Sequence, residues 1–183
     1  FIGNKKRWAK VPPHQRDLVV RFLKGSLNQK KVLALLRRIT LDGIAAARRM
    51  EKPSYAMEVM EAACLLAEAG DATGAPVLRH ALSGGEYAQE RALRALALLK
   101  DTSAVPLIIA KPLENPFFPI LLKAVRALGQ IGDVRALPAL ARVFNGRGDD
   151  LPADRSVVFT KDDPDLRRTT LEAMARIIEA NLR

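Results

Sequence analysis

The chain of 183 residues is poor in the residue types that most catalytic, metal and disulfide sites require. It contains one cysteine, one tryptophan and two histidines, and aromatic residues make up only 5% of it. The single cysteine, Cys64, excludes an internal disulfide and suits a reducing compartment such as the cytoplasm. Because Cys64 lies on an apolar stripe, we interpret it as a buried small hydrophobic side chain rather than a reactive thiol.

The sequence also lacks the patterns of common enzyme classes. The two histidines, His14 and His80, stand in no metal-ligand spacing and near no nucleophile motif. The glycines at 84–85 and at 146–148 are not preceded by the strand of a phosphate-binding loop. A helical-repeat DNA glycosylase holds its lesion with several tryptophans, and this chain has one. We therefore expect no catalytic residue, no metal and no cofactor.

The chain contains a segment that occurs three times in the same register. The copies are EAACLLAEAGD at 61–71, RALRALALLKD at 91–101 and KAVRALGQIGD at 123–133. In each copy a proline lies five residues after the aspartate. Successive copies are 30 and then 32 residues apart. Self-similarity at this length predicts a stack of small helical units that bury their apolar faces only against their neighbours.

Each copy is typical of two helices. In the third copy, apolar residues recur at steps of three and four through 124–131, which predicts an amphipathic first helix. Gly132 supplies the conformational freedom that ends this helix, and Asp133 can cap the next one through its carboxylate. The cap can also sit a residue or two later, as Thr73 and Ser103 in the other copies allow. Pro138 lies near the start of the second helix, where a missing amide costs least.

The run AVRALGQIGDVRALPAL at 124–140 resembles the HEAT family, in particular the short repeat of the phycobilisome-lyase type. The first copy departs from this pattern at Cys64 and Leu65, and the second has Lys100 where a glycine is expected. The resemblance implies an all-α solenoid, a right-handed superhelix whose first helices line the convex side and whose second helices line the concave side. It implies no lyase chemistry, because unrelated functions share this repeat.

The array extends in both directions. Upstream, 30–42 and 44–50 are predicted to be another helix pair, separated at Asp42, and a single helix precedes them at 14–24. Downstream, LEAMARII at 171–178 matches VRALGQIG at 125–132 position by position. We expect about four helix pairs with single flanking helices. The predicted organisation is a basic N-terminal segment at 1–13 and one repeat domain at 14–183, with a long loop inserted at 146–163.

The net charge of +10 is concentrated at the N-terminal end. Residues 1–52 carry 14 lysines or arginines against Asp17, Asp42 and Glu51. The opening FIGNKKRW is typical of the cytoplasmic exit of a transmembrane helix and suggests a membrane anchor upstream of residue 1. A solvated face, an anionic phospholipid surface and nucleic acid all remain open as explanations. The residues expected to face lipid or phosphate are Lys5, Lys6, Arg7, Trp8 and Lys10.

A second set of basic residues lies in the predicted second helices. Segments 72–83, 102–113 and 134–145 contain no aspartate or glutamate. If these helices line a concave groove, its surface is mildly positive and suits an acidic peptide or helix. The alternative is that the same residues only complement the dipoles of helix C-termini. The predicted partner-binding residues here are Arg79, His80, Lys111 and Arg142.

The inserted loop at 146–163 is longer than a helix connection needs. Its aspartates lack the alternating spacing and closing glutamate of a calcium loop, so that we expect no metal there. The apolar run Val157, Val158 and Phe159 is predicted to contact a partner or to fold back over the end of the groove.

From the sequence we therefore expect a non-catalytic scaffold for protein–protein interaction, which can be the cytoplasmic part of a membrane-anchored protein. The first alternative is a helical-repeat protein that binds nucleic acid through its basic N-terminal section. The second is a subunit of an enzyme similar to chromophore lyases.

Overall fold

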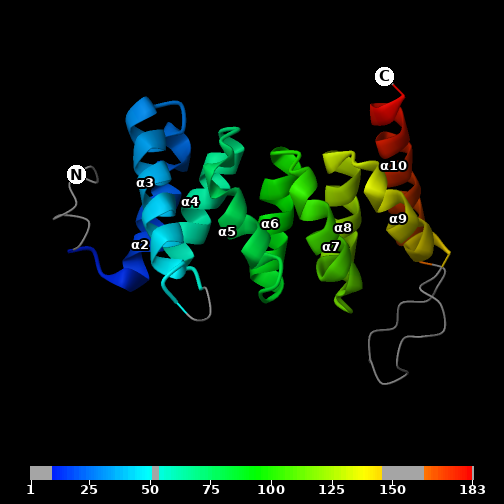
Figure 1. The fold of residues 1–183 in the computed structure, drawn as a ribbon, viewed down its shortest axis with the longest axis horizontal. Coiled ribbons are helices and arrows are strands. Elements are labelled where there is room, and N and C mark those ends of the chain that lie inside the picture. The colour runs from blue at the N-terminus through cyan, green and yellow to red at the C-terminus, as the bar shows by residue number, and fades with distance from the viewer. Residues whose placement is uncertain (1–9, 51–53, 146–162, 183) are drawn as a thin grey trace. The chain divides into compact units, whose positions relative to one another are not determined.

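The computed structural model describes residues 10–50, 54–145 and 163–182 of the chain (Figure 1). Within these ranges the regular structure consists of α-helices and short 3-10 helices, without a strand. The chain divides into two compact units, Phe1–Ala81 and Leu82–Arg183. The prediction of one repeat domain at 14–183 stays a prediction.

The first unit is built around α4. Its elements are α2 (Pro13–Phe22), the 3-10 helix η1 (Leu23–Ser26), α3 (Lys30–Ala47), α4 (Met57–Glu68), the 3-10 helix η2 (Ala72–Gly74) and α5 (Ala75–Ala81). Both α2 and α3 pack against α4, and α5 follows α4 through η2. Because α4 is enclosed in this way, nine consecutive residues, 59–67, are buried.

The second unit has α8 at its centre (Figure 1). Its elements are α6 (Glu86–Leu98), η3 (Thr102–Ala104), α7 (Val105–Ala110), η4 (Pro112–Glu114), α8 (Phe118–Ile131), η5 (Val134–Ala136), α9 (Leu137–Phe144) and α10 (Pro164–Asn181). Helix α8 packs against α6 on one side and against α10 on the other. Leu128 and Leu140 are completely buried in this unit.

The three predicted aspartate caps are confirmed. Asp71 accepts a hydrogen bond from the backbone N–H of Thr73, Asp101 from that of Ser103, and Asp133 from that of Arg135. Each aspartate begins a 3-10 turn that leads directly into the second helix. The cap therefore lies at the aspartate itself, not one or two residues later. The prolines that follow occupy the first turns of α5, α7 and α9.

The predicted break at Asp42 is wrong, because α3 continues without interruption from Lys30 to Ala47. No proline follows Asp42 to disfavour the continuation, and Asp42 lies on the exposed side of the helix. Gly43 has a packing role instead. A Cβ atom at this position would lie 2.6 Å from both Cγ atoms of Val59, so that the glycine permits close approach of α3 to α4.

Two buried polar contacts were not predicted. In the first unit, the buried carboxylate of Glu61 lies 3.2 Å from the Arg21 guanidinium. In the second, buried Gln89 donates to the Leu82 carbonyl at 3.1 Å and accepts from Asn115 at 2.7 Å. The first contact joins α2 to α4, and the second joins α6 to the residues that follow α5 and η4.

The ends of the array are close to the predictions. The helix expected at 14–24 is found as α2 followed by η1. The inserted loop lies outside the described residues except for Asp163, which caps α10 by accepting from the N–H groups of Asp165 and Leu166. The helix predicted at 171–178 is the central part of α10.

The second copy of the repeat carries backbone strain where the sequence departs from the pattern. Lys100 has φ 50°, in the left-handed region, whereas glycines occupy the same place in the other copies, Gly70 with φ 75° and Gly132 with φ 81°. For a residue with a Cβ atom this conformation costs about 1–2 kcal/mol. The turn thus keeps its geometry in spite of the lysine.

The first cap is supported by a charge from another helix. The carboxylate of Asp71 accepts from Thr73 Oγ1 at 2.6 Å and pairs with the Arg37 guanidinium of α3. Burial by itself raises the pKa of Asp71, but the hydrogen bonds from Thr73 and the pairing with Arg37 outweigh it and hold the pKa below its ordinary value of 3.8. Hydrogen bonds from the Arg135 side chain likewise lower the pKa of Asp133.

We expect Lys100→Gly to stabilise the protein. Glycine adopts the left-handed conformation without strain, and after its larger unfolded-state entropy is subtracted the net gain is about 0.5–1 kcal/mol, or roughly 2–4 °C in Tm. Thermal unfolding followed by circular dichroism measures it. The reciprocal control is Gly70→Ala, because a Cβ atom there meets no heavy atom within 4 Å and only the backbone conformation is tested. If Gly70→Ala does not lower Tm and Lys100→Gly does not raise it, the backbone at Lys100 is not strained.

The lowered pKa of Asp71 predicts a loss of stability in acid. A carboxyl group with a folded-state pKa below its unfolded value stabilises the fold above the unfolded pKa, and this stabilisation is lost as the pH falls through the folded pKa. We therefore expect the free energy of unfolding of the wild type to fall below about pH 4, and to fall less steeply in Asp71→Asn. Urea unfolding at several pH values measures the slope. Asp42→Asn, an exposed carboxylate that caps no helix, should keep the wild-type slope.

Candidate partner-binding surfaces

The second helices of the second unit lie side by side and share one direction. At their starts, Arg135 Nη2 of η5 donates to the Thr102 carbonyl of η3 at 2.9 Å. At their ends, Arg142 Nη2 of α9 lies 3.9 Å from Glu114 Oε1 of η4, just beyond α7. Because both ends are connected in this way, α7 and α9 present a continuous surface. We call it the second-helix surface and define it by Leu107, Lys111, Glu114 and Arg142.

The predicted site residues Lys111 and Arg142 are both exposed on this surface. Leu107, one turn before Lys111, is also exposed and adds an apolar contact. Glu114 lies one residue beyond the predicted second-helix segment 102–113, and its pairing with Arg142 was not predicted. The surface is therefore less positive than predicted, and an acidic ligand must compete with Glu114 for Arg142.

The other two predicted residues, Arg79 and His80, belong to the first unit and lie in the last turn of α5. The His80 ring meets the Tyr55 ring edge-on, with centroids 5.1 Å apart and an interplanar angle of 77°. Tyr55 was not predicted, since nothing in the repeat pattern points to the residues between α3 and α4. That Arg79 and His80 form one groove with Lys111 and Arg142 stays a prediction.

Several predicted residues fall outside the described part of the chain. They are Val157, Val158 and Phe159 of the inserted loop, together with Lys5, Lys6, Arg7 and Trp8. Lys10 is described and exposed. In the ranges that the structure covers, no helix combines the length and the apolar character of a membrane span.

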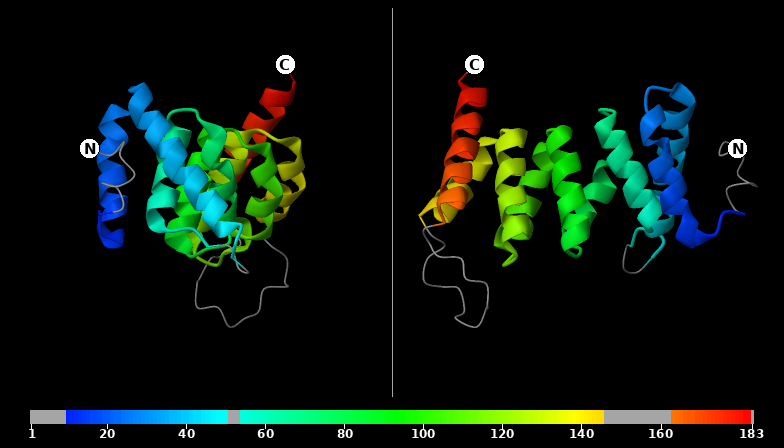
Figure 2. Two further views of the ribbon diagram at one scale, coloured as in Figure 1. Left: turned by 60° about the vertical axis from the view of Figure 1, so that its left-hand side comes forward. Right: turned by 180° about the vertical axis from the view of Figure 1, so that it is seen from behind.

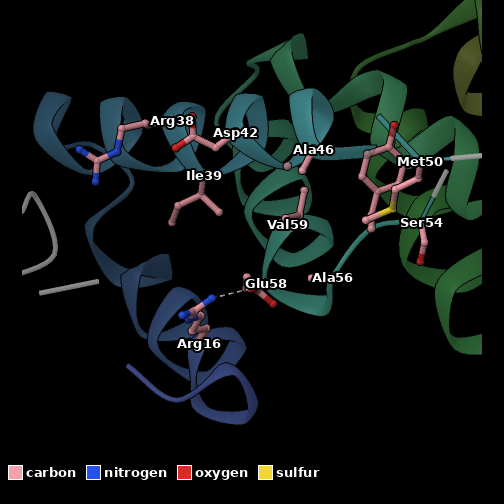
Figure 3. Close-up of a pocket in the computed structure, with 12 residues that line it drawn as sticks. Arg16, Arg38, Ile39, Asp42, Ala46, Met50, Ser54, Ala56, Glu58 and Val59 are labelled. Carbon is pink, nitrogen blue, oxygen red and sulfur yellow. Dashed lines mark ion pairs between the residues drawn. The ribbon is translucent and has the colours of Figure 1, made fainter. Parts of the chain in front are cut away.

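The first unit contains a cleft between α2, α3 and α4 that the sequence did not predict (Figure 3). Its volume is about 470 Å³. Ile39, Gly43 and Val59 contribute to an apolar lining, while Arg16 and Glu58 form an ion pair at 3.7 Å beside it. Figure 3 shows Arg38 and Asp42 on α3, across the cleft from this pair. No local pattern in the sequence indicates this cleft, because it depends on how three helices pack.

Helix α3 also displays a basic surface. Lys30, Lys31, Arg48 and Arg49 are exposed near its two ends, and Asp42 is the one carboxylate between them. We call these four residues the α3 basic surface. It is one described part of the N-terminal charge excess, and it is carried by the two ends of a single helix.

The cysteine and the described histidine both make packing contacts. Cys64 is buried, as predicted, and His80 packs against an aromatic ring. Among the residues that the structure describes, no three histidine, cysteine or acidic side chains gather as metal ligands do.

Comparison with known proteins agrees with the repeat assignment. A family model for HEAT repeats matches residues 75–157, which include α5 to α9. No curated protein matches the chain. The finer resemblance to repeats of the phycobilisome-lyase type stays a prediction. Together with the three aspartate-capped turns, the match supports a HEAT-like repeat protein, and the predicted fold class, an all-α solenoid, is confirmed.

Proposed function

We propose that this protein is a non-catalytic scaffold that binds an acidic peptide or helix of another protein through its second helices. HEAT repeats generally serve as scaffolds for protein interaction, which supports the broad class. The observation that carries the finer proposal is the contact of Arg142 with Glu114, since it brings the ends of α7 and α9 together.

The chemistry of the second-helix surface suits such a ligand. Lys111 and Arg142 lie at the C-terminal ends of helices, where a cation is also favoured by the helix dipole. Arg142 already holds one carboxylate, and a partner's carboxylate can replace Glu114 in the same geometry. The Leu107 side chain lies on the same surface and can contact the apolar side of an amphipathic ligand. In the first unit, Arg79 and His80 offer the same combination of charge and, through Tyr55, apolar area.

We expect Lys111→Glu/Arg142→Glu to weaken binding of an acidic amphipathic peptide at least tenfold, because the ligand then meets like charge. Glu114→Gln should strengthen binding, because it removes the internal competitor for Arg142. Titration of a fluorescent glutamate-rich helical peptide measures both effects. Arg126→Glu, a charge reversal on an exposed residue of first helix α8, is the matched control and should leave binding unchanged.

The same variants can be compared in pull-downs from the native cell extract. If the two reversals on the second-helix surface and the Arg126→Glu control capture the same proteins as the wild type, the proposed surface is wrong. Exposed substitutions usually change stability by no more than about 0.5 kcal/mol, so that a loss of fold is not the expected cause of any difference.

A second candidate is binding of nucleic acid, and the α3 basic surface favours it. Four exposed cations at the two ends of α3 can neutralise several phosphates and release their counterions. Attachment to an anionic membrane surface, which the N-terminal charge also supports, draws on the same residues.

Replacing Lys30, Lys31, Arg48 and Arg49 by glutamine should reduce the slope of log K against log salt for DNA or RNA by about 0.7–0.9 for each phosphate that the variant no longer neutralises. Fluorescence anisotropy at several salt concentrations measures this slope. In a parallel experiment, binding is measured to vesicles with and without anionic lipid. If the protein binds the anionic vesicles but not nucleic acid, the ligand of the α3 basic surface is the membrane surface. If the protein binds neither nucleic acid nor vesicles at low salt, the basic residues form only a solvated surface.

A further inference from the structure

Helix α2 is attached to α4 by ion pairs more than by an apolar interface. Among the side chains of α2 that the structure describes, Val20 alone is buried, and η1, which follows α2, buries none. Cations of α2 and η1 pair with carboxylates of α4 instead. The pairs are Arg16–Glu58 at 3.7 Å, Arg21–Glu61 at 3.2 Å and Lys24–Glu68 at 3.1 Å. Figure 2 shows α2, in dark blue, lying beside the other helices of the first unit.

The α4 side of this contact is one acidic face. Glu58, Glu61 and Glu68 are three and then seven residues apart, so that they lie on the same side of the helix. Leu65 falls on this side as well and is buried. Helix α4 contains no lysine or arginine that could neutralise these carboxylates from within. We call these four residues the α4 carboxylate face.

Burial is unequal across these ion pairs. The Glu61 side chain is 1% exposed, whereas the Arg21 side chain that pairs with it is 45% exposed. The same holds for Glu68, 21% exposed, and Lys24, 57% exposed. A buried carboxylate is strongly destabilising when its cation is removed. The α4 carboxylate face therefore requires a cation, but the cation reaches it from the solvent side, and any helix that presents one in the same place satisfies the requirement.

The connection from α2 to α3 also allows α2 to move. It begins with η1, which buries no residue, and a Cβ atom on Gly25 would meet no heavy atom within 4 Å. Segments with few buried apolar contacts open locally at a lower free energy than the whole domain. Ion pairs that are partly exposed contribute little to holding such a segment, and salt weakens them further. We therefore expect α2 to open more readily than α3 and α4.

We propose that α2 is a displaceable occupant of the α4 carboxylate face, and that a basic amphipathic helix of another protein binds this face in its place. Helix α2 itself indicates the chemistry of that partner. Around the aliphatic Val20 it places Arg16 four residues before, Arg21 one residue after and, in η1, Lys24 four residues after. A helix with this spacing can bury its aliphatic side chain where Val20 lies and present its cations to the same carboxylates.

Hydrogen exchange followed by mass spectrometry tests the opening of α2 in the wild type. Raising sodium chloride from about 0.1 M to about 1 M shortens the Debye length from about 10 Å to about 3 Å. The amides of α2 should then exchange at least about threefold faster, because the ion pairs that hold the helix are screened. The amides of α8 are the internal control and should keep their rates. If salt does not accelerate α2 more than α8, α2 is not held by charge and the proposal is wrong.

A labelled peptide of residues 11–27 serves as the basic helix in a binding experiment by fluorescence anisotropy. In the wild type this peptide competes with α2, whose effective concentration is on the order of millimolar. Arg21→Gln weakens the attachment of α2 and leaves Glu61 in need of a cation, so that this variant should bind the peptide at least tenfold more tightly than the wild type. Adding Glu61→Gln to it should abolish the gain, because the carboxylate that the peptide would pair with is gone.

Three controls accompany the peptide experiment. Arg126→Gln removes an exposed cation of the second unit and should keep the wild-type affinity. Lys24→Gln breaks a more exposed pair than Arg21→Gln, and it should give a smaller gain in the same direction even if Arg21→Gln does not fold. A peptide in which glutamate replaces the three cations should bind no variant. Circular dichroism checks that each variant is folded.

Two results of the binding experiment would overturn the proposal. The first is equal affinity of the peptide for the wild type, Arg21→Gln and Lys24→Gln, which would mean that α2 is not a competitor. The second is a dimer of Arg21→Gln in sedimentation velocity, which would identify the α2 of a second copy as the occupant. The acidic-peptide proposal is tested separately, because no residue of the second-helix surface is changed and Arg21→Gln should bind the glutamate-rich peptide as the wild type does.

Discussion

The structure depends on one turn that is repeated three times. A residue in the left-handed conformation ends each first helix, and the aspartate that follows caps the 3-10 turn leading into the second helix. This turn sets the angle between the two helices through local backbone conformation, independently of which side chains pack between them. The strained Lys100 shows how strong the requirement is: the turn keeps its conformation even where the residue does not suit it.

The turns also connect the copies to one another. Asp71 holds Arg37 of α3, and Arg135, which lies beside Asp133, donates to the Thr102 carbonyl of the preceding turn. The residue that begins a second helix therefore takes part in stacking it on its neighbour. In the first copy this stacking includes a charge, because the pKa of Asp71 is lowered by the hydrogen bonds from Thr73 and by the pairing with Arg37 of α3. The pKa of Asp133 is lowered by Arg135 within its own turn.

The features that the sequence predicted well are those set within a few residues. The Asp–Pro spacing indicated the caps and the starts of the second helices, and the apolar period indicated α4, α6, α8 and α10. The break at Asp42 was wrong because a glycine after an aspartate can end a helix or admit a neighbour, and only the position of Val59 distinguishes the two. The pairing of Arg142 with Glu114 and the contact of Tyr55 with His80 depend on packing between elements, which no local pattern records.

The same division separates the second helices from the first helices. The second helices are short and carry exposed charge at their ends, so that substitutions there leave the packed row of first helices undisturbed. The first helices bury apolar residues on two sides, as α8 does between α6 and α10, and a helix built for two neighbours exposes one apolar side wherever the row stops. Such an exposed side follows from the packing rule itself.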